Sequence, residues 1–144
     1  MKKTNINKRY LFKEDYNSNF SQLLENHSKV ISILDSLNSC SLVNDFITLV
    51  IFPDREYYWV GTEILGPPAD LYHENIFFYD TFDMTVLKFN QNFKENIMGI
   101  DDFHRIFQNL AIKYKDKINN SLYQVNFKVS DNKFHCEFLV FYSI

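Results

Sequence analysis

The stretch 45–63, DFITLVIFPDREYYWVGTE, decides the fold of this chain. Its first half, 45–52, is rich in β-branched residues and almost continuously apolar, which is typical of a strand buried on both faces. Proline, aspartate and arginine at 53–55 are typical of a turn. Residues 56–63 are then expected to pair with 45–52 as the second strand. The sequence therefore predicts a β-hairpin in the middle of the chain.

The C-terminal segment predicts a second hairpin. From residue 123 onward apolar and polar residues alternate, which gives the sheet one dry face and one wet face. Residues 130–133 have turn chemistry. On the dry face we expect Tyr123, Val125, Phe127 and Val129 before the turn, and Phe134, Cys136, Phe138, Val140 and Tyr142 after it. On the wet face we expect Gln124, Asn126 and Lys128.

Further strands and two helices are predicted between and before these hairpins. Residues 75–79 and 84–89 favour short strands, although the second segment could equally begin a helix that runs to about residue 97. Apolar residues at helical spacing predict helices over about 18–38 and about 101–118. The second helix is expected to begin at two aspartates, because the exposed N–H groups and the dipole of a helix start favour carboxylates.

The order of these elements predicts the fold class. Two helices packed on a mostly antiparallel sheet of about six strands would bury both helical stripes in an α+β fold. A chain of 144 residues with 46% hydrophobic content is expected to form a single domain, 1–144. Residues 1–16 read as a polar N-terminal lead-in, which Tyr10, Leu11 and Phe12 attach to the body of the domain.

The sequence contains no motif for catalysis, for a cofactor or for a metal. There is no G-x-S-x-G, and three glycines cannot supply a phosphate-binding loop. Asp70, His73 and Glu74 form the densest set of possible metal ligands, but their spacing matches no ligand pattern. We therefore predict a non-enzymatic protein with no catalytic residue, no cofactor and no metal.

Charge, hydropathy and cysteine content indicate which classes of partner and which cellular compartment to expect. The formal net charge of −3 gives no support for binding to nucleic acid. No apolar run reaches the roughly 20 residues that span a bilayer, and the N-terminal lysines are not followed by the apolar stretch of a secretory signal. Cys40 and Cys136 lie far apart and form no disulfide framework. These features predict a cytoplasmic protein that binds neither nucleic acid nor membrane.

Acidic and aromatic residues are concentrated between residues 54 and 83. This stretch holds seven carboxylates and one cation, Arg55, for a local charge of −6, so the rest of the chain sums to +3. A negative surface steers a basic partner, and rigid aromatic side chains supply contact area, although the carboxylates could instead only solvate loops and outer strand faces. We expect one exposed surface with the contact residues Asp54, Glu56, Tyr58, Glu63, Asp70, Tyr72, Glu74, Asp80 and Asp83.

The C-terminal third, a helix of about 101–118 followed by SLYQVNFKVSDNKFHCEFLVFY (121–142), resembles the ending of small bacterial immunity or antitoxin proteins of the YezG-like kind. The turn residues that carry the resemblance are Asp131, Asn132, Lys133 and Phe134, and the glycine common at such turns is missing. The resemblance implies a non-enzymatic, cytoplasmic protein that binds a cognate toxin domain, often a nuclease, and blocks its active site or substrate path. A nuclease site must be basic to hold phosphates, so an acidic aromatic surface suits this role.

Other functions stay open beside the immunity-type inhibitor. A dimerising structural or adaptor module would pair exposed strand edges. A small-molecule binder or enzyme would use a pocket among the aromatic side chains. An accessory protein of a virus or mobile element is a further alternative, and both a monomer and a homodimer are compatible with the sequence.

Overall fold

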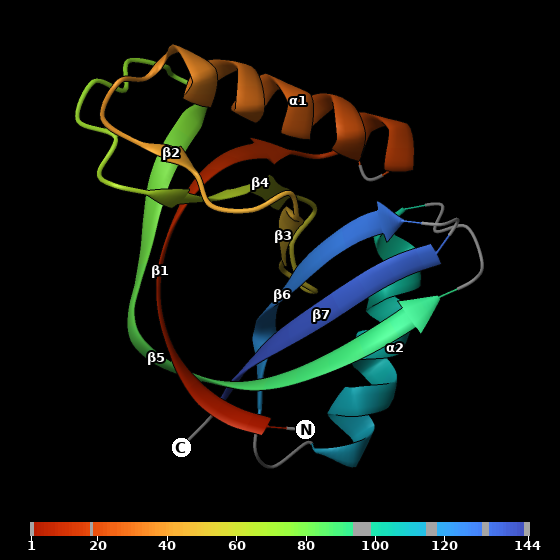
Figure 1. The fold of residues 1–144 in the computed structure, drawn as a ribbon. Coiled ribbons are helices and arrows are strands. Elements are labelled where there is room, and N and C mark those ends of the chain that lie inside the picture. The colour runs from red at the N-terminus through yellow and green to blue at the C-terminus, as the bar shows by residue number, and fades with distance from the viewer. Residues whose placement is uncertain (1, 18, 94–98, 115–117, 131–132, 143–144) are drawn as a thin grey trace.

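The computed structural model describes residues 2–17, 19–93, 99–114, 118–130 and 133–142 (Figure 1). Within them, α1 (Phe20–Ser36) and α2 (Ile100–Lys113) confirm the two predicted helices. The strands are β1 (Lys2–Asp15), β2 (Ser41–Leu42), β3 (Ile47–Ile51), β4 (Tyr58–Leu65), β5 (Ile76–Phe93), β6 (Ile118–Ser130) and β7 (Lys133–Tyr142). The described chain is thus mixed α+β and mostly strand.

The sheet closes on itself into a barrel. Its antiparallel strands follow the order β1-β5-β7-β6-β3-β4-β2, and β1 pairs with β4 as well as with β5. Six strands therefore form a ring, and β2 lies outside the ring beside β4. In Figure 1, β1 and β5 curve together around the barrel. The mostly antiparallel sheet is confirmed, and its closure is a feature that the sequence patterns did not predict.

The predicted N-terminal lead-in is wrong, because residues 2–15 form β1. Tyr10, Leu11 and Phe12 are at most 1% exposed. Odd-numbered residues from 3 to 9 are exposed, whereas the even-numbered residues between them are buried or half-buried. The alternation of a strand is therefore present, but polar residues occupy both faces and hide it.

One long, bent strand replaces the two strands predicted over 75–79 and 84–89. Within β5 the register against β1 shifts between Ile6 and Lys8, and Asp83 adopts a φ of 51°. An irregularity of this kind bends a strand and increases its twist, which helps the sheet to curve. The alternative helix over 84–97 is wrong for residues 84–93, which are strand, and residues 94–98 lie outside the described residues.

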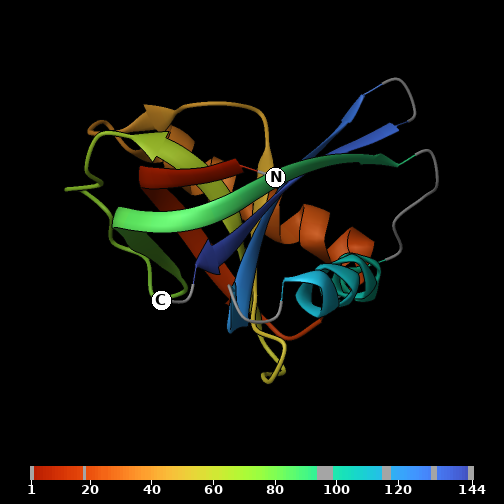
Figure 2. The same ribbon diagram turned by 90° about the horizontal axis from the view of Figure 1, so that it is seen from below.

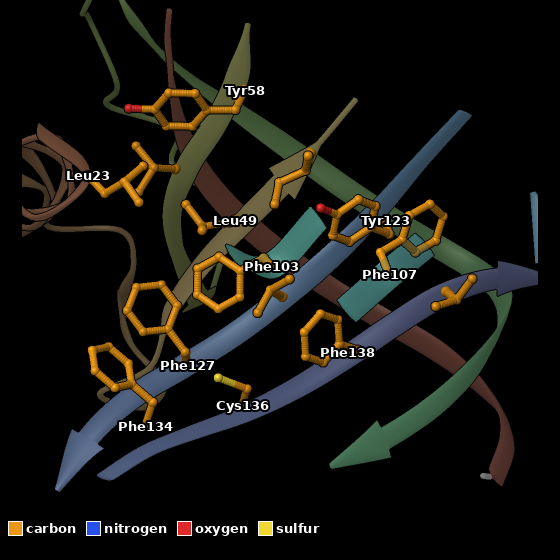
Figure 3. Close-up of a cluster of buried hydrophobic side chains, with 14 of the residues drawn as sticks. Leu23, Leu49, Tyr58, Phe103, Phe107, Tyr123, Phe127, Phe134, Cys136 and Phe138 are labelled. Atoms are coloured by element: carbon orange, nitrogen blue, oxygen red, sulfur yellow. The ribbon is translucent and has the colours of Figure 1, made fainter. Parts of the chain in front are cut away.

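The helices cover the outer surface of the barrel. Val30 and Leu34 of α1 pack against a cluster that includes Leu11 of β1. Phe103 and Phe107 of α2 pack over the outward faces of β3, β6 and β7 in the largest core cluster (Figure 3). Residues 115–117, at the predicted end of the second helix, lie outside the described residues, and residue 118 begins β6.

The predicted wet face of the C-terminal hairpin points into the barrel instead of into solvent. Gln124 and Asn126 are 1% and 8% exposed. Gln124 Nε2 donates a 3.0 Å hydrogen bond to the Tyr10 hydroxyl, and this bond crosses the interior because β6 and β1 are not neighbours in the sheet. The interior thus contains an apolar part, around Phe12 and Trp59, and a separate polar part.

Candidate functional site

A cleft of about 170 Å³ lies where three segments meet at one end of the barrel. These segments are 14–16 at the end of β1, 53–57 in the loop between β3 and β4, and 100–104 at the start of α2. In Figure 2 the loop between β3 and β4 (yellow) projects at this end. Side chains that line the cleft include Tyr16, Arg55, Glu56, Tyr57, Asp101 and His104.

Two tyrosines form the accessible aromatic part of the cleft. Tyr16 is 66% exposed, and its ring meets the ring of Tyr57 edge-on, with 6.4 Å between the centroids. Tyr57 in turn packs against Phe52 at 5.2 Å. Aromatic side chains held in this way present a large contact area at low cost in conformational entropy, as in the centres of protein interfaces.

The rim of the cleft carries an excess of negative charge. Glu56 and Asp101 are exposed side chains on its lining. The lining holds these two carboxylates against one cation, Arg55, a formal charge of −1. Glu14, Asp15 and Asp102 lie nearby, but they already have partners in the Trp59 indole, the Asn26 amide and the Arg105 guanidinium, respectively. This end of the molecule therefore attracts cations.

A buried hydrogen-bond network fixes the inner side of the cleft. Asn26 of α1 is fully buried, and its amide donates to the Asp15 carboxylate and, at 3.3 Å, to the Tyr58 hydroxyl. Tyr58 donates to the Asn17 carbonyl at 2.7 Å, and burial raises the pKa of Tyr58 to about 12. Burial opposes ionisation of Asp15, but hydrogen bonds from Asn26 and from the backbone N–H groups of Tyr16 and Asn17 outweigh it and lower the Asp15 pKa. Asp15 is therefore charged at neutral pH, and the Tyr58 hydroxyl is neutral.

His104 and Tyr123 meet at the α2 side of the cleft. The Nδ1 atom of His104 lies 3.4 Å from the Tyr123 hydroxyl. Burial, and to a lesser degree the charge of Asp101, raise the pKa of Tyr123. The Tyr123 hydroxyl is therefore protonated at neutral pH.

The nine predicted contact residues do not share one surface. Asp54 and Glu56 lie in the loop at the cleft, whereas Asp70, Tyr72 and Glu74 lie in the loop between β4 and β5. The two loops leave opposite ends of β4, whose eight residues span about 26 Å. The single acidic surface expected from the sequence is therefore divided.

Asp80 and Asp83 form a further exposed position, on β5. Asp83 lies beside the N-terminal part of β1, where its carboxylate accepts a 3.3 Å hydrogen bond from the Asn5 amide. Asp80 pairs in register with Arg9 of β1. Neither residue lines the cleft.

Three predicted residues besides Asp83 have partners within the protein. Tyr58 is 2% exposed, and Glu63 forms a 3.3 Å ion pair with Lys8 on the interior side of the barrel. The prediction that Tyr58 and Glu63 are surface contacts is therefore wrong. The alternation of side chains along β4 directs Tyr58 toward α1 and Glu63 toward the interior of the barrel. Asp70 accepts hydrogen bonds from the backbone N–H of Asn38 and the hydroxyl of Ser39, which lower its pKa. Its carboxylate therefore ties the β4–β5 loop to the end of α1.

Sequence reasoning did not include Tyr16, Tyr57, Asp101 or His104 among the contact residues. Tyr57 belongs to the acidic aromatic stretch, so the composition of that stretch could have indicated it as a contact residue. Tyr16 is the last residue of the segment interpreted as a lead-in, and Asp101 was interpreted as part of a helix start. Only the folded chain brings these residues to one place.

The described residues offer no alternative centre for metal or thiol chemistry. Among them, no group of three or more His, Cys, Asp or Glu side chains is placed to hold a metal ion. His73 Nδ1 accepts a 3.2 Å hydrogen bond from the Asn75 backbone N–H. Cys40 and Cys136 are both free, and burial raises the pKa of Cys136 to about 12. No helix within the described ranges has the length and apolar character needed to cross a membrane.

Comparison with known proteins identifies no family. No protein-family model matches the chain, and no curated protein is significantly similar to it. The assignment of the candidate site therefore depends on the geometry of the cleft alone.

Proposed function

We propose that the protein is a non-enzymatic, immunity-type inhibitor that binds a basic, nuclease-type bacterial toxin domain. The cleft between the β3–β4 loop and α2 accepts a cationic side chain of this partner. One observation carries the proposal: the exposed carboxylates of Glu56 and Asp101 lie beside the Tyr16–Tyr57 pair in a single concave site.

The chemistry of the cleft favours an arginine or lysine as the group that enters it. A guanidinium stacks on aromatic rings through cation–π attraction and pairs with carboxylates through its fork of N–H donors. The negative charge of the cleft lining, where Glu56 and Asp101 outnumber Arg55, increases the rate of encounter with a basic surface, chiefly at low salt. Recognition of this kind needs a rigid cleft, and the Asn26 network supplies one.

Inhibition then follows from occlusion. A nuclease holds phosphates with arginine and lysine side chains, and a side chain engaged in this cleft is no longer available to the substrate. A cytoplasmic location belongs to the same proposal, and the two free cysteines support it because a reducing compartment keeps thiols unpaired.

Binding of an oligo-arginine peptide, measured by calorimetry at low and at physiological salt, tests the proposal. We expect wild-type protein to bind the peptide with an affinity that falls as salt screens the carboxylates. Combining Glu56→Lys with Asp101→Lys should weaken binding at low salt by about tenfold or more, because each change turns an attraction into a repulsion.

The matched control is Glu74→Lys combined with Asp80→Lys, which changes the net charge by the same amount away from the cleft. Its affinity should stay within about twofold of wild type. Equal weakening by the two double variants would show that only net charge matters, and absence of binding to wild type would also contradict the proposal.

A further inference from the structure

A ring of polar side chains lines the interior of the barrel near one of its mouths. Each of the six strands that close the barrel contributes one member. In the order of the strands around the ring, these are Lys8 of β1, Lys88 of β5, Glu137 of β7, Asn126 of β6, Thr48 of β3 and Glu63 of β4. Strands distant in the sequence thus converge on one polar layer.

The side chains of the ring hold one another in place through ion pairs and hydrogen bonds. Lys8 pairs with Glu63 at 3.3 Å, and Lys88 pairs with Glu137 at 3.0 Å. The Asn126 amide donates to Glu137 at 3.2 Å and its carbonyl accepts from the Thr48 hydroxyl at 2.8 Å. A connected network of this kind holds side chains in fixed directions, which is the condition for a specific site.

The ring encloses space. The cavity has a volume of about 160 Å³. An engineered cavity of about 150 Å³ in another protein holds one benzene ring, so the space here suits a ligand of about six non-hydrogen atoms. Lys8 and Glu63 also line an open groove of about 540 Å³ beside β1, β4 and β5, so this ion pair lies between the cavity and the groove.

The four charged side chains of the ring differ in their exposure to solvent. The side chains of Lys8 and Lys88 are 35% and 39% exposed, whereas those of Glu63 and Glu137 are 18% and 22% exposed. All four charged side chains are therefore partly accessible to solvent. Two cations and two anions make the lining neutral.

We propose that this cavity binds a small zwitterion of the amino-acid class. Its ammonium group pairs with Glu63 and Glu137, and its carboxylate pairs with Lys8 and Lys88. A neutral lining disfavours a ligand with net charge, because the unbalanced charge would be partly desolvated without a counter-ion. A ligand with one charge of each sign can bridge the two ion pairs through charge-assisted hydrogen bonds without adding net charge to the site.

This site is separate from the acidic aromatic cleft. The two share no lining residue, so either proposal can fail while the other holds. The cavity belongs to the barrel interior, and a ligand there would be a second function or a stabilising component of the same protein.

A titration followed by NMR of the Asn126 side-chain amide tests the proposal, with glycine as the probe. Glycine at millimolar concentrations should produce a saturable shift of this signal. Sodium acetate and methylammonium chloride, each carrying one half of the charge pair, and glycerol, which carries none, should produce at most a tenth of the saturable effect at the same ionic strength. A shift by glycerol as large as that by glycine, or no saturable shift by glycine, would overturn the proposal.

Variants locate the site. Lys88→Met combined with Glu137→Gln removes one ion pair and should weaken glycine binding at least tenfold. Lys29→Met combined with Glu25→Gln removes the exposed 3.5 Å ion pair of α1 and should leave the affinity unchanged. If the first double variant is poorly folded, the comparison of glycine with its charged halves on wild-type protein still decides the outcome. Undiminished binding to a folded Lys88→Met, Glu137→Gln protein would overturn the assignment.

Discussion

Replacing Gly61 with alanine is expected to open the barrel along the seam between β1 and β4. Gly61 pairs with Phe12 of β1, and a Cβ atom added at Gly61 would lie 1.7 Å from the carbonyl oxygen of Leu11. The obstructing atom belongs to the backbone, so no side-chain rotation relieves the clash. Overpacking costs about 1–3 kcal/mol where side chains can adjust, and we expect at least about 3 kcal/mol here. Urea unfolding followed by the fluorescence of Trp59, the only tryptophan, measures the free energy of unfolding.

Thr62→Val is the matched control for Gly61→Ala, because it adds no volume at the next residue of the same strand. The Thr62 hydroxyl is buried and lacks a hydrogen-bond partner within the described residues, so its removal should leave stability unchanged or raise it by up to about 1 kcal/mol. A Gly61→Ala protein that unfolds within about 1 kcal/mol of wild type would show that β1 and β4 do not approach this closely.

Phe12→Ala is expected to cost about 3–5 kcal/mol, because Phe12 occupies the centre of the apolar part of the barrel. Its ring is fully buried and stacks on Tyr10 at 5.2 Å, and the ring of Trp59 lies 5.9 Å away. The aromatic neighbours come from different strands and cannot collapse easily into the space that the ring leaves. The free energy of unfolding should be measured by far-UV circular dichroism, since the emission of Trp59 will itself change.

Phe78→Ala serves as the control for Phe12→Ala. Phe78 is 38% exposed, and its truncation removes the same atoms from a site in contact with water. It should cost well under half as much, because part of its surface is already solvated. Similar losses for the two variants would contradict the burial of Phe12 within a closed barrel.

The sequence predicted the individual helices and strands better than it predicted the closure of the sheet into a barrel. Both helices follow from an apolar stripe at helical spacing, and β3 follows from a nearly continuous apolar run that is rich in β-branched residues. Closure depends on β1, whose polar residues on both faces conceal its alternation. The polar residues inside the barrel, such as Gln124 and Asn126, have the same effect, because alternation alone does not say which face is wet.

The candidate site was predictable in its chemistry and only partly in its residues. Glu56 was identified from the acidic stretch, and it does line the cleft. Glu63 came from the same stretch, yet it faces Lys8, because a single step along a strand reverses the direction of a side chain. Asp101 reaches the cleft through the packing of α2 on the barrel, which is tertiary information that composition does not contain.

The most direct test of the central claim, that a cationic partner binds at the cleft, is a backbone amide NMR titration with the oligo-arginine peptide. The largest shifts should fall on Tyr16, Glu56, Tyr57 and Asp101, and they should shrink as salt is added. Shifts that are equal or larger over residues 70–83, with none at the cleft, would contradict the account.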